Sequence, residues 1–356
     1  MRDNEPTLTM SRAELVTARV LGVAARLAVG LPTFARLALF GTPPRNDRGD
    51  ALDDATHVLA KLDEWALGAL SQPEIEVSRT AMRRGTASVA KARPPSVVVR
   101  ATSIAGRPAR AYFPATDGKN ATKPPLLVFF HGGGWAVGDL DTHDSLCARI
   151  AADAGWAVLS VDYRLAPEHP CPAPFDDAIA AFRAAPAWAA DAGVATTGIA
   201  VGGDSAGGNL SAAVSVATRD AGETMPALQL LIYPALDLRR LTPSHTSCAA
   251  GPLLTSADID HFLKLFAAPD ITELSVSPGL VADVAGLPTT IITSAGFDPL
   301  RDEAEAFAER LSAAGVDVTH LHAPTLAHGY ASMDGAVAAA DVQVGLICQA
   351  LRRHHS

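Results

Sequence analysis

Short apolar runs alternate along the chain with longer alanine-rich segments of helical periodicity. The apolar runs predict strands over residues 124–130, 156–163, 198–203, 228–234, 289–296 and 316–322. Most are continuously apolar, which is typical of strands covered on both faces. The segments between them end near a glycine, a common helix stop. This succession predicts an α/β fold, with a mostly parallel central sheet flanked by helices.

Three regions depart from this alternation. Residues 96–114, SVVVRATSIAGRPARAYFP, predict a hairpin that opens the sheet. Residues 1–94 are largely helical in pattern, with basic and proline-rich breaks, and residues 239–286 place one helix among Pro, Ser and Thr. Both of the latter could form a lid. We therefore expect an N-terminal helical cap segment over 1–94 and an α/β domain over 95–356, with a cap insertion at about 239–286.

Composition and charge exclude several classes of protein. The chain has 356 residues, of which 48% are hydrophobic and 19% charged, so it can bury a sizeable core. Its formal charge of −9 and the lack of a Lys/Arg run argue against a nucleic-acid partner. The four cysteines are widely spaced and form no CxxC pair, so we expect free thiols and a cytoplasmic location.

The apolar stretch from Met10 to Phe40 is the only segment that resembles a targeting signal. Arginines interrupt it at positions 12, 19, 26 and 36. A membrane span needs about 20 apolar residues with few charges, and a secretory signal needs an unbroken apolar centre. The stretch therefore predicts an amphipathic helix packed on the protein itself, with contact to a membrane surface as the alternative.

The sequence Gly203-Asp204-Ser205-Ala206-Gly207 follows an apolar strand and opens a helical pattern. This is the context of a nucleophile elbow, a strand-to-helix turn so tight that its flanking positions must be small. The turn exposes the serine hydroxyl at the positive end of a helix. Ser205 is therefore the candidate nucleophile.

The sequence HGGGW, from His131 to Trp135, comes directly after another predicted strand. Consecutive glycines leave backbone N–H groups unshielded, as an oxyanion hole requires. We expect the N–H groups of Gly133 and Gly134 to serve as donors, together with that of Ala206, which follows the nucleophile. His131 is expected to fix the loop rather than to carry a proton.

A serine nucleophile needs a base, and that base needs an orienting acid, in the chain order serine, acid, histidine for this type of sheet. His328 follows the last predicted strand, at the edge where sites gather in open α/β sheets, and is the candidate base. His245 and His261 belong to the predicted lid. His320 and His322 form an H-x-H pair on a strand, where a metal site is possible but lacks an obvious third ligand.

Asp298 is the candidate acid because it occupies the equivalent loop after the strand at 289–296. Pro299 keeps it out of the following helix. Asp302 is the alternative, but it should lie in the first helical turn, where the helix dipole already favours an acidic residue.

Five stretches together resemble the hormone-sensitive-lipase-like branch of the α/β-hydrolase family, which includes bacterial carboxylesterases. They are HGGGWAVGDLDTHDSLCARIA, VDYRLAPEHPCPAPFDDA, GDSAGGNL, SAGFDPLRDEAEAFAERL and AHGY, and they span residues 126–330. The resemblance implies an α/β-hydrolase fold, a Ser205–Asp298–His328 triad and the oxyanion donors named above. It also implies a lid built from the N-terminus and the later insertion. We further expect Trp135 and Tyr330 to contact the substrate.

The implied activity is hydrolysis of short- to medium-chain carboxylic esters through an acyl-enzyme, without a metal or organic cofactor. An amidase, arylformamidase or deacetylase would use the same triad, and a lipase acting at oil interfaces stays open. A non-catalytic small-molecule receptor on the same fold is a weaker alternative, because His328 is in place. By analogy with the family, a homodimer is possible.

Overall fold

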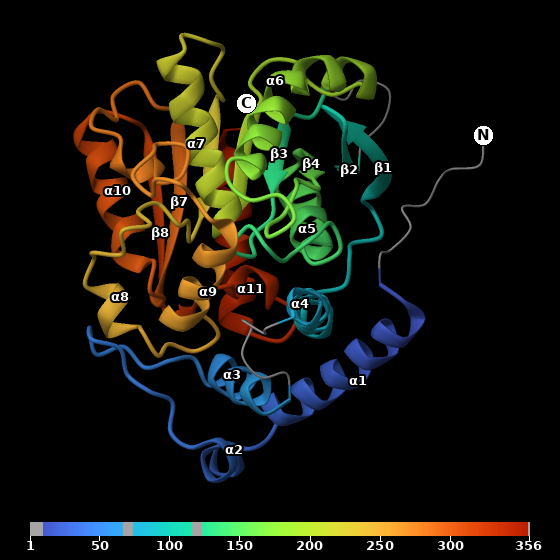
Figure 1. The fold of residues 1–356 in the computed structure, drawn as a ribbon. Coiled ribbons are helices and arrows are strands. Elements are labelled where there is room, and N and C mark those ends of the chain that lie inside the picture. The colour runs from blue at the N-terminus through green and yellow to red at the C-terminus, as the bar shows by residue number, and fades with distance from the viewer. Residues whose placement is uncertain (1–9, 67–73, 116–122, 355–356) are drawn as a thin grey trace.

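A central sheet of eight strands organises the chain, in a computed structural model that describes residues 10–66, 74–115 and 123–354. The strand order is β1-β2-β4-β3-β5-β6-β7-β8 (Figure 1). The β1–β2 hairpin pairs antiparallel to β4, and all other neighbouring strands are parallel. The strands are β1 (Val98–Ile104), β2 (Arg107–Phe113), β3 (Leu126–Phe130), β4 (Ala157–Val161), β5 (Ala200–Asp204), β6 (Leu228–Ile232), β7 (Thr289–Phe297) and β8 (Val318–Ala327). The predicted fold class is confirmed.

Helices cover both faces of the sheet (Figure 1). They are α5 (Asp144–Ala154), α6 (Ala173–Ala192), α7 (Ala206–Asp220), α10 (Arg301–Ala313) and α11 (Ala338–Arg353). Successive residues of β3 alternate between two hydrophobic clusters: Leu127 and Phe129 pack with residues of α5 and α11, and Val128 and Phe130 with residues of α6 and α7. This two-sided burial explains why the strand sequences are continuously apolar.

The last strand is longer than its sequence predicts. The sequence predicts a strand over residues 316–322, but β8 continues through Pro324 to Ala327, which pairs with Phe297 of β7. Proline has no N–H to donate, yet an edge strand tolerates it because one side of that strand has no neighbour. As a result, His328 follows directly on a strand.

The two regions outside the α/β rhythm form helices. The N-terminal region contains α1 (Arg12–Val29), α2 (Thr33–Phe40), α3 (Asp54–Ala66) and α4 (Ile75–Val89); the later one contains α8 (Ser244–Ser247), α9 (Ser256–Phe266) and the short η1 (Pro278–Leu280). Figure 1 shows α1 to α4, α8 and α9 at one end of the sheet. Capping boxes begin α1 at Ser11 and α9 at Thr255.

Arginines on α4 attach the N-terminal helices to the α/β domain. Arg79 forms an ion pair with Glu168 at 2.7 Å, and Arg83 pairs with Asp139 at 3.3 Å. Among the described helices none by itself is long and apolar enough to cross a membrane, whereas α1 and α2 pass that test only together, across a 115° bend.

Candidate active site

Ser205 lies in a left-handed turn between β5 and α7, with φ of 53°. Such a conformation is strained for a non-glycine residue and persists only where the surroundings enforce it. A Cβ at Gly203 or Gly207 would overlap the carbonyl oxygen of Phe130 on the neighbouring strand. The glycines on either side of Ser205 are therefore needed because the turn passes directly against β3.

A hydrogen-bonded relay joins three residues from different loops. His328 Nε2 lies 2.9 Å from Ser205 Oγ, and His328 Nδ1 lies 2.8 Å from Asp298 Oδ2. The other oxygen of Asp298 accepts the backbone N–H of Leu300 at 2.8 Å. Because Asp298 is 1% exposed and accepts on both oxygens, it fixes Nδ1 of the ring as a donor. This leaves Nε2 free to accept the serine proton.

The loop after β3 presents backbone N–H groups beside the hydroxyl. Gly133 and Gly134 have φ values of 119° and 56°, and a Cβ at Gly134 would lie 2.5 Å from the ring of Phe262. Within residues 10–66, 74–115 and 123–354, the N–H groups of Gly133, Gly134 and Ala206 donate to no other residue. All three residues line the same cavity as Ser205. They are therefore suited to hold an oxygen anion.

Asp204 anchors this loop, a role that no sequence motif assigned to it. It is buried; its Oδ1 accepts the Gly132 N–H at 2.8 Å and pairs with His143 Nε2 at 2.9 Å. Although burial raises the pKa of a carboxyl, the His143 imidazole and the Gly132 N–H outweigh it and lower the pKa of Asp204. The sequence offered one indication of this role: Asp204 is a carboxylate in a stretch predicted to be buried, and a buried charge needs a partner.

His131 also holds this loop in place through a contact with Gly132. Its Nδ1 lies 2.8 Å from the Gly132 carbonyl oxygen, and its ring stacks on Tyr163 at 4.3 Å between centroids. Complete burial, with a smaller contribution from His143, lowers the pKa of His131 to about 4. The ring is neutral at pH 7, in keeping with a structural role.

A cavity of about 390 Å³ opens onto Ser205. Its walls come from α1, α3, α4 and α9 as well as from the sheet domain, and they are mostly apolar; they include Leu21, Leu59, Leu62, Met82, Phe262 and Met333. Trp135 also lines it, with its ring stacked on Phe266 at 4.4 Å. The volume lies in the range of small-molecule sites.

Tyr330 does not reach this cavity, so the expectation that it contacts the substrate is wrong. The side chain is fully buried and donates its hydroxyl to Thr293 Oγ1 at 2.9 Å. Its ring meets Tyr233 edge-on at 5.0 Å. Instead, Gly329, Ser332 and Met333 of the same loop line the cavity. The side chain of Tyr330 thus points toward β7 and away from the cavity.

The alternative candidates have other partners. Asp302 lies in the first turn of α10 and forms ion pairs with Arg48 and Arg301. His245 lines the cavity, but its Nε2 lies 3.0 Å from Glu303 Oε2. His320 and His322 lie on β8, away from Ser205, beside Glu305 of α10.

Asp63 of α3 places a carboxyl in the mostly apolar wall of the cavity. Burial, with a smaller contribution from the charge of Asp258, raises the pKa of Asp63 to about 6 from an ordinary 3.8. The folded state therefore holds a proton that the unfolded chain releases, and stability falls as the pH rises from about 4 to about 6.

We expect Asp63→Asn to raise the free energy of unfolding at pH 8, by up to about 3 kcal/mol at 1.36 kcal/mol per pKa unit, and to leave it unchanged at pH 4. Thermal melts at both pH values measure this difference. The control is Glu64→Gln on the same helix, whose carboxylate is exposed and pairs with Lys61. An equal gain for Asp63→Asn at both pH values would contradict the assigned burial cost.

Comparison with known proteins accords with this geometry. Residues 127–332 match the family model described as alpha/beta hydrolase fold. The chain is 39% identical over 370 aligned residues to the carboxylic ester hydrolase LipN of Mycobacterium tuberculosis, covering 99% of this chain and 96% of that protein. It is also 39% identical to the carboxylesterase NlhH of the same species, over 69% of this chain and 78% of that protein.

Solved structures show the same relationship. The crystal structure of DphMB1 superposes with a TM-score of 0.77 at 39% identity, covering 85% of this chain and 99% of that one. The carboxylesterase EstE1, cloned from a metagenomic library, superposes with a TM-score of 0.72 at 31% identity, covering 80% of this chain and 98% of that one. The chain belongs to the α/β-hydrolase family, in the branch of esterases that resembles hormone-sensitive lipase.

Proposed function

We propose that the chain hydrolyses short- to medium-chain carboxylic esters, with Ser205 as nucleophile, His328 as general base and Asp298 as its orienting acid. The observation that carries this proposal is the continuous relay of 2.9 and 2.8 Å hydrogen bonds from Ser205 to Asp298. Trp135 would contact the substrate from the cavity wall. The helices α1, α3, α4 and α9 would act as the cap over the site.

The proposed reaction proceeds by acyl transfer. As His328 Nε2 takes the proton of Ser205, the Oγ attacks the ester carbonyl, and the carbonyl oxygen becomes an anion facing Gly133, Gly134 and Ala206. The imidazolium returns the proton to the departing alcohol, which leaves an acyl-enzyme. A water then loses its proton to His328, attacks the acyl carbon, and releases the carboxylic acid and Ser205.

The cavity supports a preference for short to medium acyl chains. We expect kcat/KM for p-nitrophenyl esters to peak between butyrate and octanoate and to fall toward palmitate, because about 390 Å³ of apolar space accommodates only a limited chain. Met82→Trp, which fills part of the wall, should shift the peak to shorter chains and leave acetate turnover unchanged. The highest kcat/KM on palmitate would contradict the proposal.

Matched p-nitrophenyl butyrate, butyranilide and N-formyl substrates separate an esterase from an amidase, arylformamidase or deacetylase. We expect the ester to be turned over fastest. A receptor on this fold would bind such compounds without turnover. Faster hydrolysis of the anilide would indicate an amidase in place of an esterase, with the same Ser205–His328–Asp298 triad.

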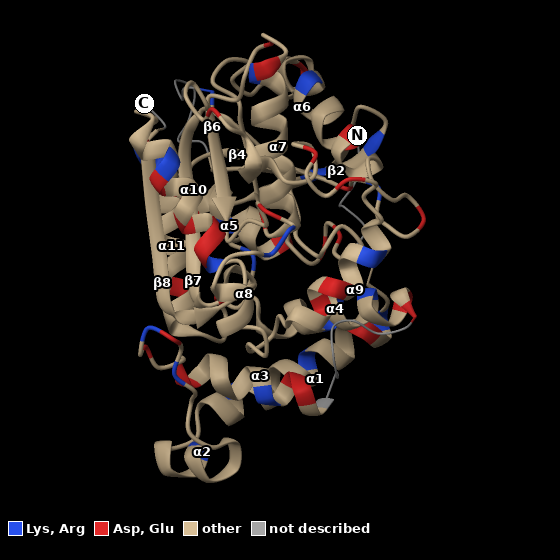
Figure 2. Cartoon of the chain, turned by 60° about the vertical axis from the view of Figure 1, so that its left-hand side comes forward, with Lys and Arg blue, Asp and Glu red and all other residues tan. Residues whose placement is uncertain are grey.

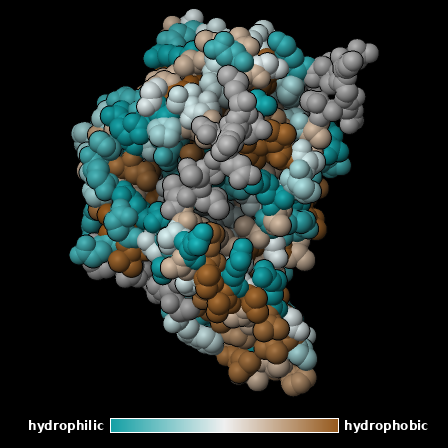
Figure 3. All heavy atoms as spheres, turned by 90° about the vertical axis from the view of Figure 1, so that its right-hand side faces the viewer, coloured by the Kyte–Doolittle hydropathy of each residue, from teal (hydrophilic) through white to brown (hydrophobic). Residues whose placement is uncertain are grey.

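The outer face of α1 and α2 is unusually apolar for a protein surface. Val16, Val20, Val23 and Leu27 follow one another at helical spacing and are 60, 63, 52 and 69% exposed, and Phe34 on α2 is 77% exposed. Figure 3 shows hydrophobic residues gathered over this part of the molecule, and Figure 2 shows α2 almost without charged residues. Contiguous apolar patches of this kind mark interaction surfaces.

Arginines lie along the apolar face of α1. Arg12, Arg19 and Arg26 are exposed, and no described residue forms an ion pair with them. They form a basic edge on a chain with a formal charge of −9. Because the inner face of the same helix lines the cavity, we infer that α1 and α2 rest on an anionic lipid surface from which substrate can enter.

Sedimentation with vesicles tests this contact. We expect binding to vesicles that contain phosphatidylglycerol, less to pure phosphatidylcholine, and loss of binding in Val20→Glu/Leu27→Glu. The control is Val342→Glu on α11, where Val342 is 65% exposed. Equal binding by the double variant would contradict the proposal, as would a dimer in solution that the double variant dissociates, because a second copy would then cover the face. A cytoplasmic location stays a prediction.

A further inference from the structure

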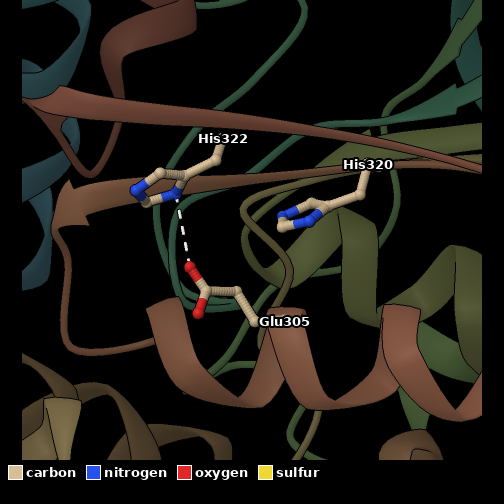
Figure 4. A group of neighbouring side chains, drawn as sticks. All are labelled: Glu305, His320 and His322. Carbon is tan, nitrogen blue, oxygen red and sulfur yellow. Dashed lines mark ion pairs between the residues drawn. The ribbon is translucent and has the colours of Figure 1, made fainter.

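The geometry points to a metal site outside the catalytic cavity: we propose that His320, His322 and Glu305 bind a divalent zinc ion. His320 and His322 lie two residues apart on β8 and therefore project from the same face of the strand. Glu305 lies on the helix that packs against that face, so α10 supplies the third ligand that the H-x-H pattern lacked (Figure 4).

The donor atoms already converge. One nitrogen of each histidine and one carboxylate oxygen of Glu305 all lie within 4.8 Å of one another, and His322 Nδ1 is 3.3 Å from Glu305 Oε1. Tetrahedral zinc with bonds of about 2.0–2.2 Å holds its donors about 3.4 Å apart. Small side-chain rotations are therefore enough to close the three donors around an ion.

Ser294 of β7 lies at the centre of this group. Its Oγ is 2.9 Å from His320 Nε2, 2.8 Å from His322 Nδ1 and 3.4 Å from Glu305 Oε1. A hydroxyl has one proton to donate, so it cannot donate to all three partners at once. It is placed to hold the ligands in register, or to hydrogen-bond a water in the fourth position.

The chemistry of the donors suits zinc. Two imidazoles and one carboxylate form a ligand set typical of zinc with one open position. A neutral imidazole offers a nitrogen lone pair to a metal ion. The His320 side chain is exposed, which leaves a path from solvent.

Arg48 is the competing cation. Its guanidinium lies 2.9 Å from Glu305 Oε1 and 2.6 Å from Oε2, and it also reaches Asp302 at 3.1 Å. Metal binding would leave Oε2 with Arg48 and transfer Oε1 to the ion. Removing Arg48 should therefore tighten binding, because a positive charge next to the metal opposes it.

The proposed metal site lies outside the catalytic site, but it shares the strands β7 and β8 that lead to Asp298 and His328. Ser294 lies four residues before Asp298, and His322 lies six residues before His328. The ion would join β7, β8 and α10 just before the loops that carry the acid and the base. Because the unfolded chain does not bring these donors together, metal binding should stabilise the folded protein.

Titration of the EDTA-treated full chain with ZnCl₂ and CoCl₂ tests the site. We expect one equivalent of zinc by calorimetry, a rise in melting temperature of a few degrees, and visible absorption bands of four-coordinate cobalt. His320→Gln, His322→Gln and Glu305→Gln should each weaken zinc binding at least tenfold, Arg48→Ala should tighten it, and His354→Gln should leave it unchanged.

Turnover of p-nitrophenyl butyrate without added metal shows that each variant is folded, since these side chains do not line the cavity. The absence of a stoichiometric zinc site would overturn the proposal, as would binding that persists in both histidine variants. Unchanged or weaker binding by Arg48→Ala would exclude Glu305 from the ligand set.

Discussion

Replacing Ser205 with alanine should lower kcat on p-nitrophenyl butyrate by about 10⁶-fold, the scale of nucleophile loss in serine hydrolases. The hydroxyl is the only group within hydrogen-bond reach of His328 Nε2 that can attack a carbonyl in this cavity, among the residues that the structure describes. A water activated by His328 and the remaining amide donors would account for residual turnover.

The folded state should tolerate this change. Among the described residues, Ser205 Oγ makes one side-chain hydrogen bond, so its loss costs about 1 kcal/mol. Circular dichroism and thermal melts check this, and a serine-reactive phosphonate should label the unmodified chain but not Ser205→Ala. Ser332→Ala is the matched control, because Ser332 lines the same cavity and takes no part in the relay. Undiminished turnover by Ser205→Ala would remove the proposed mechanism.

Asp298→Asn should lower kcat by about 10⁴-fold while the geometry of the site is retained. The side-chain oxygen of the introduced asparagine would keep the Leu300 N–H, which places its NH₂ group against His328 Nδ1. The ring would then carry its proton on Nε2, facing Ser205, and could not accept the serine proton. The loss comes from the tautomer rather than from the fold.

Asp302→Asn tests whether Asp302, the alternative candidate, could be the orienting acid in place of Asp298. Asp302 pairs with Arg48 and Arg301 and accepts the Ser244 N–H at 2.8 Å, all away from His328. We expect a lower melting temperature and less than a tenfold loss of kcat. A larger loss of kcat in Asp302→Asn than in Asp298→Asn would reverse the assignment of the acid.

The sequence predicted the architecture well because the relevant signals are local. Continuous apolar runs of strand length imply burial on two faces, and the structure shows Leu127 and Val128 packed on opposite sides of the sheet. The nucleophile elbow was also predictable, because β3 lies so close to the turn that Gly203 and Gly207 have no room for a side chain. The strand predicted over residues 316–322 ends later, at Ala327, because β8 is an edge strand and can include Pro324, which has no backbone N–H to donate.

The order of the elements and the residues able to carry chemistry can therefore be read from the sequence, since both follow from periodicity, backbone sterics and side-chain type. The tertiary fold determines which of these groups meet. It paired Asp204 with Gly132 and His143, turned Tyr330 away from the cavity, and brought Glu305 to His320 and His322. These contacts join segments distant in the chain, and their geometry depends on strand order and helix packing, which no local pattern specifies.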